Sequence, residues 1–153
     1  RALDQQIQSG EEVEFAIAIC DVNGLKTVND TQGHIAGDKY IRMASKLVCE
    51  TFKHSPVFRV GGDEFVAILR GADFVNREQL EQQLYDTVKR NADEDKVVLA
   101  CGISVFDQKH DKSVSAVFER ADAMMYRNKM ALKGGRDEIL NTIIRTIGAR
   151  TTI

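Results

Sequence analysis

Two apolar runs of the chain, 57–60 and 65–69, are separated only by the residues Gly-Gly-Asp-Glu at 61–64. Short runs rich in Val, Phe and Ile that are joined by a glycine-containing segment are typical of a β-hairpin. The two strands of a hairpin pair antiparallel, so this feature commits part of the sheet to antiparallel pairing.

Further strand-like and helical segments surround the hairpin. Runs rich in Val, Ile, Phe and Ala lie at 15–20 and 97–105 and are typical of strands. Apolar residues recur at helical spacing over 37–52, 76–90 and 113–132. This order of elements predicts an α+β fold in which helices flank a central, mostly antiparallel sheet.

Length, charge and cysteine content narrow the class of protein. A chain of 153 residues fits one domain with a sizeable core. Its formal net charge of −2 at pH 7 provides no broad basic face, so we expect no nucleic-acid partner. Cys20, Cys49 and Cys101 have no metal-ligand spacing and are typical of buried thiols in a reducing compartment. We therefore expect a cytoplasmic domain, either free or part of a membrane-attached protein.

The two ends of the chain bear on what lies outside this sequence. The first residue is Arg1 rather than Met, so we expect an attached sensor or effector domain outside this sequence. The segment 137–153 carries apolar residues at helical spacing and predicts an amphipathic helix. This helix could pack on the preceding domain, which we place at 1–136, or lead into a following one.

A carboxylate follows the strand-like run at 15–20. Asp21 at this position is costly to bury unless a cation or several N–H groups lie nearby. Asp is also a frequent turn residue, and for Asp21 alone that role is favoured. If the strand pairs beside the hairpin, Asp21 and Asp63 meet at one edge of the sheet together with the Val22 carbonyl. Such oxygens suit Mg²⁺ completed by substrate phosphates, as in phosphoryl-transferring enzymes.

The glycines of the hairpin, Gly61 and Gly62, allow two interpretations. Gly-Gly turns occur in many folds, and solvated acids at the tip of such a turn need no function. Glycines also let backbone N–H groups approach a phosphate closely. The turn alone does not decide between these interpretations.

Several polar residues follow Asp21 within a short stretch, namely Lys26, Asn29, Asp30, His34, Gly37 and Asp38. Asn and Asp side chains can recognise a purine edge, because an Asp accepts from the ring N–H and the amine of guanine. In a structural alternative, Asp38 is the N-cap of a helix at 39–52, and Asn29 and His34 are turn residues.

Several motifs, taken together, resemble one family. They are CDVNGLKTVNDTQGHIAGDKYI at 20–41, GGDEF at 61–65, CGISVF at 101–106 and ERADAMMYRNK at 119–129. In this order they resemble the GGDEF family of diguanylate cyclases, over nearly the whole chain up to residue 136. The resemblance implies a five-stranded, mostly antiparallel sheet similar to the palm of nucleotide cyclases and polymerases.

The resemblance also implies roles for individual residues. It assigns a metal ion, Mg²⁺ or Mn²⁺, to Asp21, Asp63, Glu64 and the carbonyl of Val22. It assigns catalysis to Asp63, Glu64 and Lys26, with Glu64 assisting either metal binding or removal of a proton from the attacking hydroxyl. The residues that it assigns to the substrate GTP are Asn29, His34, Asp38, Gly61, Gly62, Lys129, Lys133 and Arg136.

The reaction implied by the family condenses two GTP molecules into cyclic di-GMP and two pyrophosphates. Each domain holds one GTP, so two domains must face each other as a homodimer. Asp38 favours GTP over ATP, because adenine presents an acceptor where guanine presents an N–H. The rival functions are a GTP-binding regulatory domain without turnover, a cyclase of mixed dinucleotides and a structural dimerisation domain, and the last leaves the clustered acids unexplained.

Two departures from the family pattern concern charged residues. The Arg-x-x-Asp site through which product inhibits many members would fall on Phe52 and Ser55, so we expect no such inhibition. The arginine that usually lies four residues after Lys129 is Lys133 here, and either Lys133 or the later Arg136 takes its place.

Two other departures concern the ends of the domain. A helical run at 137–148 stands where the family closes its sheet with a strand. The Asp-x-Leu-Thr-Gly-Leu segment of the family would come just before residue 1, so we expect the N-terminal edge of the domain to be truncated and its activity weakened.

Overall fold

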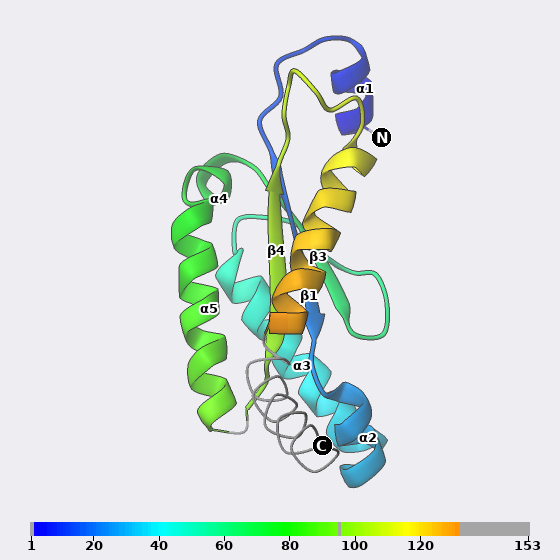
Figure 1. The fold of residues 1–153 in the computed structure, drawn as a ribbon, viewed down its shortest axis with the longest axis vertical. Coiled ribbons are helices and arrows are strands. Elements are labelled where there is room, and N and C mark those ends of the chain that lie inside the picture. Colours follow the sequence, from blue (N-terminus) through cyan, green and yellow to red (C-terminus); the bar gives the residue numbers. More distant parts are fainter. Residues whose placement is uncertain (1, 95, 132–153) are drawn as a thin grey trace, which may run out of the picture.

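The structure of the protein is a computed structural model that describes residues 2–94 and 96–131. In these residues one sheet contains four strands in the order β2-β3-β1-β4 (Figure 1). The strands are β1 (Ala16–Val22), β2 (Val57–Arg59), β3 (Glu64–Leu69) and β4 (Leu99–Val105), and all neighbours pair antiparallel. The hairpin and the antiparallel α+β fold are confirmed, whereas five strands are wrong for the described residues.

The described chain turns helical after β4, and the position at which the family closes its sheet, 137–148, lies outside the described residues. The chain passes through a loop at 106–113 and is helical over 114–131. Val117, Ala121 and Met125 are the buried residues of this helical segment. A spacing of four places them on one face of a helix, whereas a strand would alternate every second residue.

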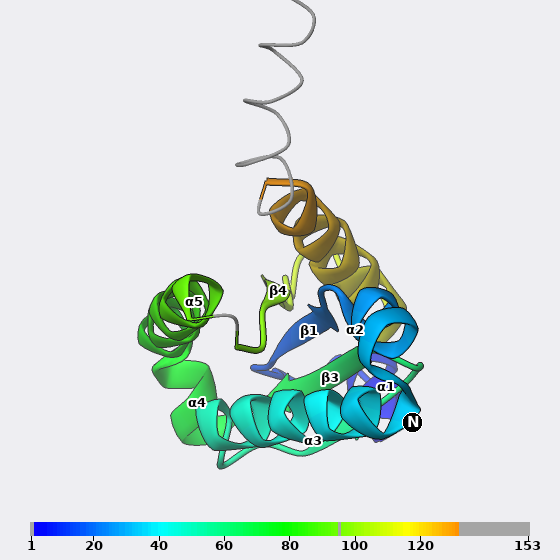
Figure 2. The ribbon, with the colours of Figure 1, turned by 90° about the horizontal axis from the view of Figure 1, so that it is seen from below.

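Helices cover both faces of the sheet (Figures 1 and 2). They are α1 (Ala2–Gln8), α2 (Leu25–Gln32), α3 (His34–Thr51), α4 (Gly71–Val75), α5 (Arg77–Asp93) and the helical residues 114–131, which we call the 114–131 helix. α3 and α5 contribute to the core on one face, and α1 and the 114–131 helix to the core on the other.

β1 is the central strand and is buried on both faces. Ala18 and Cys20 belong to the core under α3 and α5, and Ile17 and Ile19 belong to the core under the 114–131 helix. This division follows from the alternation of side chains along a strand. Within β1 only Asp21 is partly exposed, so the one charged residue of the strand is also the one that solvent reaches.

The 114–131 helix lies directly against β4. Gly102 of β4 is buried, and a Cβ at this position would overlap the carbonyl oxygen of Ala121 and the amide nitrogen of Met125. A glycine therefore permits the close approach of helix and strand.

Polar contacts fix the N-terminal half of the same helix. The backbone N–H of Val114 donates to Asp4 Oδ1 of α1 over 2.8 Å. Arg120 donates to both carboxylate oxygens of the buried Asp111 over 2.7 Å and to Ser104 Oγ over 2.9 Å. The hydrogen bond from Arg120 lowers the pKa of Asp111, so this carboxylate stays charged.

Helix ends differ from the predicted ones by a few residues. α3 begins at His34 after Gly33, which has a φ of 89°, so the alternative in which Asp38 caps this helix is wrong. Asn29 lies within α2, and His34 opens α3, so neither is a turn residue. The domain boundary at 136 and the predicted helix at 137–153 lie outside the described residues and stay predictions.

The cysteines only partly follow the expectation of buried thiols. Cys20 is buried and Cys101 partly so, but Cys49 is exposed. Cys49 follows the buried Val48 on α3 and so lies on the outer face of that helix. Among the described residues, no helix is both long enough and apolar enough to cross a bilayer.

Candidate functional site

The predicted metal ligands come together where β1 ends and β3 begins. Asp21 pairs with Glu64 in the antiparallel register, and the backbone N–H of Val22 donates to the carbonyl oxygen of Asp63 over 2.8 Å. The hairpin therefore lies beside β1, which places Asp21, Asp63 and Glu64 at one edge of the sheet. We call these three residues the acidic edge.

Burial and repulsion act together on the acidic edge. Burial raises the pKa of Asp21, a hydrogen bond from Lys129 Nζ to its Oδ1 (3.0 Å) lowers it, and the charges of Asp63 and Asp122 raise it. Burial likewise raises the pKa of Glu64, with further contributions from Asp122, Asp21 and Asp63. Several carboxylates thus share the positive charge of Lys129, and an added cation would relieve their repulsion.

Asp122 is not among the residues that the sequence predicted for the site. It lies on the 114–131 helix, seven residues before Lys129 and therefore on the same helical face. This spacing inside the motif at 119–129 is the sequence signal that could have identified it. Its charge acts on both Asp21 and Glu64, so it belongs to the electrostatics of the site.

The oxygens of the acidic edge fit a magnesium ion that a substrate completes. In the described part of the chain, no three His, Cys, Asp or Glu side chains are grouped to hold a metal by themselves. Mg²⁺ is usually bound by one or two carboxylates together with substrate phosphates. Asp21 and Asp63 on neighbouring strands supply two such carboxylates, and the Val22 carbonyl supplies another hard oxygen.

The fold does not require the two glycines of the β2–β3 turn. Neither Gly61 nor Gly62 has a positive φ. Among the described residues, a Cβ at Gly61 would meet only the Cβ of Glu64, at 3.8 Å, and a Cβ at Gly62 would meet nothing within 4 Å. A left-handed backbone or a crowded contact within the chain therefore does not explain these glycines. They leave an uncovered stretch of backbone next to the acidic edge.

The predicted purine-reading residues lie on α2 and α3, at the end of the sheet where β1 terminates (Figure 1). The amide of Asn29 occupies the space that a Cβ at Gly37 would need. Gly37 is buried, and the neighbouring Asp38 is exposed. The two helices thus bring Asn29 beside the residue that precedes Asp38.

Other predicted site residues make few or no side-chain contacts with the acidic edge or with the rest of the described chain. Lys26, His34 and Asp38 are exposed, and none of their side chains forms a hydrogen bond or ion pair within the described residues. Lys129, in contrast, contacts the acidic edge through Asp21. Lys133 and Arg136 lie outside the described residues.

The two positions where the family pattern places an inhibitory site carry no charge. Phe52 is completely buried in the core. Ser55 Oγ donates to Asp73 Oδ2 over 2.6 Å, and the same carboxylate oxygen accepts from the backbone N–H of His54 over 2.9 Å. Both positions are therefore engaged in packing and in a local hydrogen-bond network.

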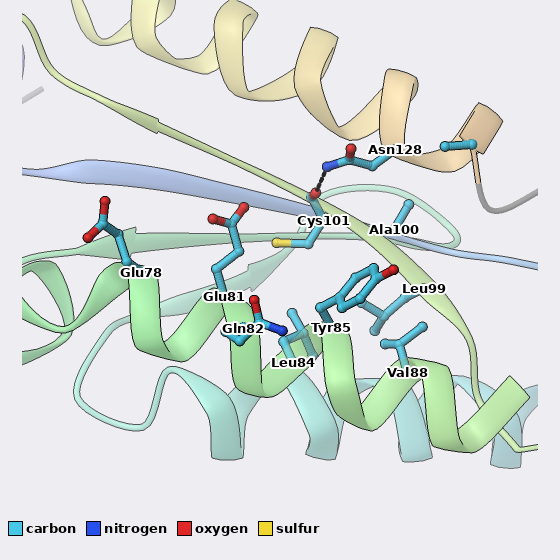
Figure 3. A pocket seen from close by; sticks show the side chains of 11 residues that line it. Glu78, Glu81, Gln82, Leu84, Tyr85, Val88, Leu99, Ala100, Cys101 and Asn128 are labelled. Carbon is cyan, nitrogen blue, oxygen red and sulfur yellow. Dashed lines mark hydrogen bonds between the residues drawn. The ribbon is translucent and has the colours of Figure 1, made fainter.

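A groove of about 400 Å³ lies between α5, β4 and the 114–131 helix (Figure 3). Its lining is apolar at Leu84, Val88 and Leu99, and Asn128 Nδ2 donates to the carbonyl of Cys101 over 2.6 Å. None of the predicted site residues lines this groove. We therefore locate the candidate site at the acidic edge and not at this cavity.

Comparison with known proteins gives the same family that the motifs resemble. The family described as diguanylate cyclase, GGDEF domain, matches residues 1–135. The diguanylate cyclase DgcP of Pseudomonas aeruginosa is 29% identical over 132 residues, which are 82% of this chain and 19% of that protein. The diguanylate cyclase DgcZ of Escherichia coli is 27% identical over 84% of this chain and 45% of its own length. An uncharacterized membrane protein of Staphylococcus haemolyticus, SH2145, is 28% identical over 92% of this chain and 41% of its own length.

Solved structures share the fold. The GGDEF domain of DgcB from Caulobacter crescentus in complex with c-di-GMP has a TM-score of 0.66 at 24% identity, over 89% of this chain and 81% of that one. Another microbial GGDEF domain, described in an interaction with cyclic di-GMP, has a TM-score of 0.62 at 26% identity, over 86% and 82% of the two chains. The chain spans less than half the length of the three curated relatives named above.

Proposed function

Because this chain belongs to the GGDEF family of diguanylate cyclase domains, we propose that it condenses two GTP molecules into cyclic di-GMP and two pyrophosphates. Each domain holds one GTP, and two domains face each other as a homodimer. The reaction depends on Mg²⁺ or Mn²⁺. The proposed surroundings are cytoplasmic, with a sensor or effector domain attached outside this chain.

One observation carries this proposal, namely the geometry of the acidic edge. Strand register holds Asp21 beside Glu64, and a backbone hydrogen bond ties Asp63 to Val22. The adjoining turn carries glycines that packing within the chain does not explain. Carboxylates for a metal beside open backbone for a phosphate are what a phosphoryl-transferring site needs.

In this proposal, residues of the chain hold the metal ion, accept a proton from the substrate and place positive charge near the phosphates. Asp21 and Asp63 would hold the metal with the Val22 carbonyl, and the bound metal would neutralise charge that develops on the phosphates. Glu64 has a pKa raised by burial and by neighbouring carboxylates, which suits it to accept the proton of the attacking 3′-hydroxyl. Lys129, which contacts Asp21, places positive charge where the phosphates would bind.

The remaining predicted residues bind the substrate. Asn29 and Asp38 recognise the guanine edge, and His34 at the start of α3 lines the same nucleotide pocket. The backbone of Gly61 and Gly62 faces the phosphates. Basic side chains complete the charge balance, and those assigned to this role are Lys26, Lys129 and one of Lys133 and Arg136.

Product inhibition through the family's Arg-x-x-Asp site is not part of the proposal. Phe52 is buried in the core, and Ser55 is bound to Asp73, so neither position presents a charge to cyclic di-GMP. We therefore expect the rate of product formation to be insensitive to cyclic di-GMP acting at these positions.

The test is to incubate the chain with GTP and Mg²⁺ and to identify the products by chromatography. Cyclic di-GMP and pyrophosphate are expected from the unaltered chain, and Asp63→Asn should abolish both. Asp93→Asn, which removes an exposed carboxylate at the end of α5, is the matched control and should leave product formation unchanged. Tight GTP binding without product would contradict the cyclase and identify the alternative, a catalytically silent GTP-binding regulatory domain.

A further inference from the structure

Both peptide groups that flank Asp63 are held by hydrogen bonds. The carbonyl that follows its Cα, that of Asp63 itself, accepts from the backbone N–H of Val22 over 2.8 Å. The carbonyl that precedes its Cα, that of Gly62, accepts from Arg59 Nη2 over 2.6 Å. The first bond belongs to the pairing between β3 and β1, and the second depends on a single side chain.

The second bond matters because the turn has few other restraints. The backbone N–H of Val60 donates to the carbonyl of Glu64 over 2.9 Å and closes the turn at its base. Gly61 and Gly62 lie between these residues, and glycine has the widest conformational freedom of all residues. Among the described residues, Arg59 provides the only hydrogen bond to the carbonyl of Gly62.

The orientation of this peptide affects both a side chain and an N–H group. The flanking peptides determine the direction of the Cα–Cβ bond of Asp63, and therefore where its carboxylate can reach. The peptide between Gly62 and Asp63 is trans, so the N–H of Asp63 points away from the Arg59 guanidinium. Among the described residues this N–H has no acceptor, which leaves it available to a phosphate oxygen.

We propose that Arg59 is a positioning residue, which holds the Gly62 carbonyl and thereby aims the carboxylate of Asp63 and its backbone N–H at the metal and phosphate. The identity of that ligand rests on the proposed function. The placement of the turn does not, because the contact lies entirely within the chain.

A role in global stability does not account for this arginine. Arg59 is exposed and ends the short edge strand β2. In the part of the chain that the structure describes, its guanidinium bonds a carbonyl and no carboxylate, so its removal leaves no charge there without a partner. Replacement of exposed residues of this kind usually changes the free energy of unfolding very little. A loss of function in an Arg59 variant can therefore be measured on a folded protein.

The first experiment measures the backbone conformation of the turn by NMR, with no ligand added. Arg59→Ala is expected to shift the backbone amide NMR signals of Gly62 and Asp63, while the thermal midpoint stays at the value of the unaltered chain. Arg70→Ala is the matched control, because Arg70 is an exposed arginine beyond the other end of β3 and its side chain forms no hydrogen bond within the described residues. Unchanged signals for Gly62 and Asp63 in Arg59→Ala would overturn the proposal.

The second experiment measures the dissociation constant of GTP with and without Mg²⁺. Residues that orient a metal ligand typically change affinity about 10–100-fold when removed. We expect a weakening of this size in Arg59→Ala with Mg²⁺, and a much smaller one without Mg²⁺. In the Asp63→Asn background, Arg59→Ala should cause no more than the small loss expected without Mg²⁺, because the carboxylate is then absent and only the backbone N–H of residue 63 is still affected.

The outcomes separate the possible failures. An equal loss in both backgrounds, or an equal loss without Mg²⁺, would mean that Arg59 contacts the nucleotide directly, and would overturn its role as a positioning residue. If the unaltered chain bound no GTP, the proposed function would fail. The NMR comparison would then still decide whether Arg59 fixes the turn.

Discussion

At the residue scale, Gly37 packs α3 against α2 so closely that no side chain fits at this position. Gly37 is buried in the first turns of α3, and any Cβ there would overlap the amide of Asn29. The overlap involves the same side chain that we propose for recognition of guanine. A single methyl group can therefore test the position of Asn29 without removing Asn29.

We predict that Gly37→Ala displaces the Asn29 amide and weakens GTP binding about tenfold, as expected for one lost hydrogen bond. Binding of ATP should change less, so the preference for GTP should decrease. The fold should persist, because Ala is the better helix former at an interior helix position. Calorimetric titration with GTP and ATP provides the measurement.

A double substitution controls this prediction. In Asn29→Ala the overlapping atoms are absent, so adding Gly37→Ala should not weaken GTP binding further. A further loss in that background would show that Gly37 acts through the packing of α2 and α3 in general, and not through Asn29.

Single residues also show which parts of the candidate site could be predicted from the sequence. The meeting of Asp21 and Asp63 could be predicted, because each stands at the end of a recognisable strand and strand pairing brings those ends together. Asp122 was missed, although it stands seven residues before Lys129 in the motif at 119–129, because it lies 59 positions after Asp63 and reaches the site only through the docking of a helix. Arg59 also escaped prediction, since its contact depends on the shape of an exposed turn.

At the scale of elements, the 114–131 helix carries Lys129 to the acidic edge, and Gly102 sets its distance from β4. A Cβ at Gly102 would overlap backbone atoms of Ala121 and Met125, which cannot rotate away as a side chain would. The helix as a whole must shift to make room. Lys129, two turns further along, would then lose its 3.0 Å contact with Asp21.

We predict that Gly102→Ala lowers the free energy of unfolding by about 1–3 kcal/mol, the usual cost of overpacking. It should also reduce cyclic di-GMP formation, because Lys129 moves away from the acidic edge. Urea unfolding followed by circular dichroism measures the stability. Gly62→Ala is the matched control, since a Cβ there meets nothing and stability should change by less than about 0.5 kcal/mol. Equal stabilities of the two variants would contradict the proposed role of Gly102.

Element boundaries show which physical signals are visible in a sequence. The hairpin and the central strand were predictable, because apolar runs and short glycine-containing connections are local features. The start of α3 at His34 was not, since Gly33 precedes it with a φ of 89° and no side chain caps the helix. The number of strands depends on how distant segments pair, which no local pattern specifies.

At the scale of the whole molecule, the acidic edge makes the stability of the fold depend on pH. The pKa of Glu64 in the folded chain is raised above the usual 4.5 of Glu, first by burial and then by Asp122, Asp21 and Asp63. The folded chain therefore holds this proton more tightly than the unfolded chain. Stability then falls as pH rises through the interval from about 4.5 up to the folded pKa of Glu64.

We predict that Glu64→Gln removes this loss, because glutamine stays uncharged at every pH. Below about pH 4.5 the variant and the unaltered chain should have similar thermal midpoints, since Glu64 is then protonated in both states. As pH rises, the variant should become the more stable one, and the difference should level off once Glu64 is fully ionised. Thermal unfolding at a series of pH values from 3.5 to 8 measures this difference.

Glu50→Gln, at an exposed position on α3, serves as the control and should follow the unaltered chain. A difference that is constant over pH, or a variant that is less stable at neutral pH, would show that crowding of carboxylates does not govern this part of the molecule. The predicted pattern would mean that the chain tolerates a destabilising cluster of charge at the place where a metal ion would neutralise it.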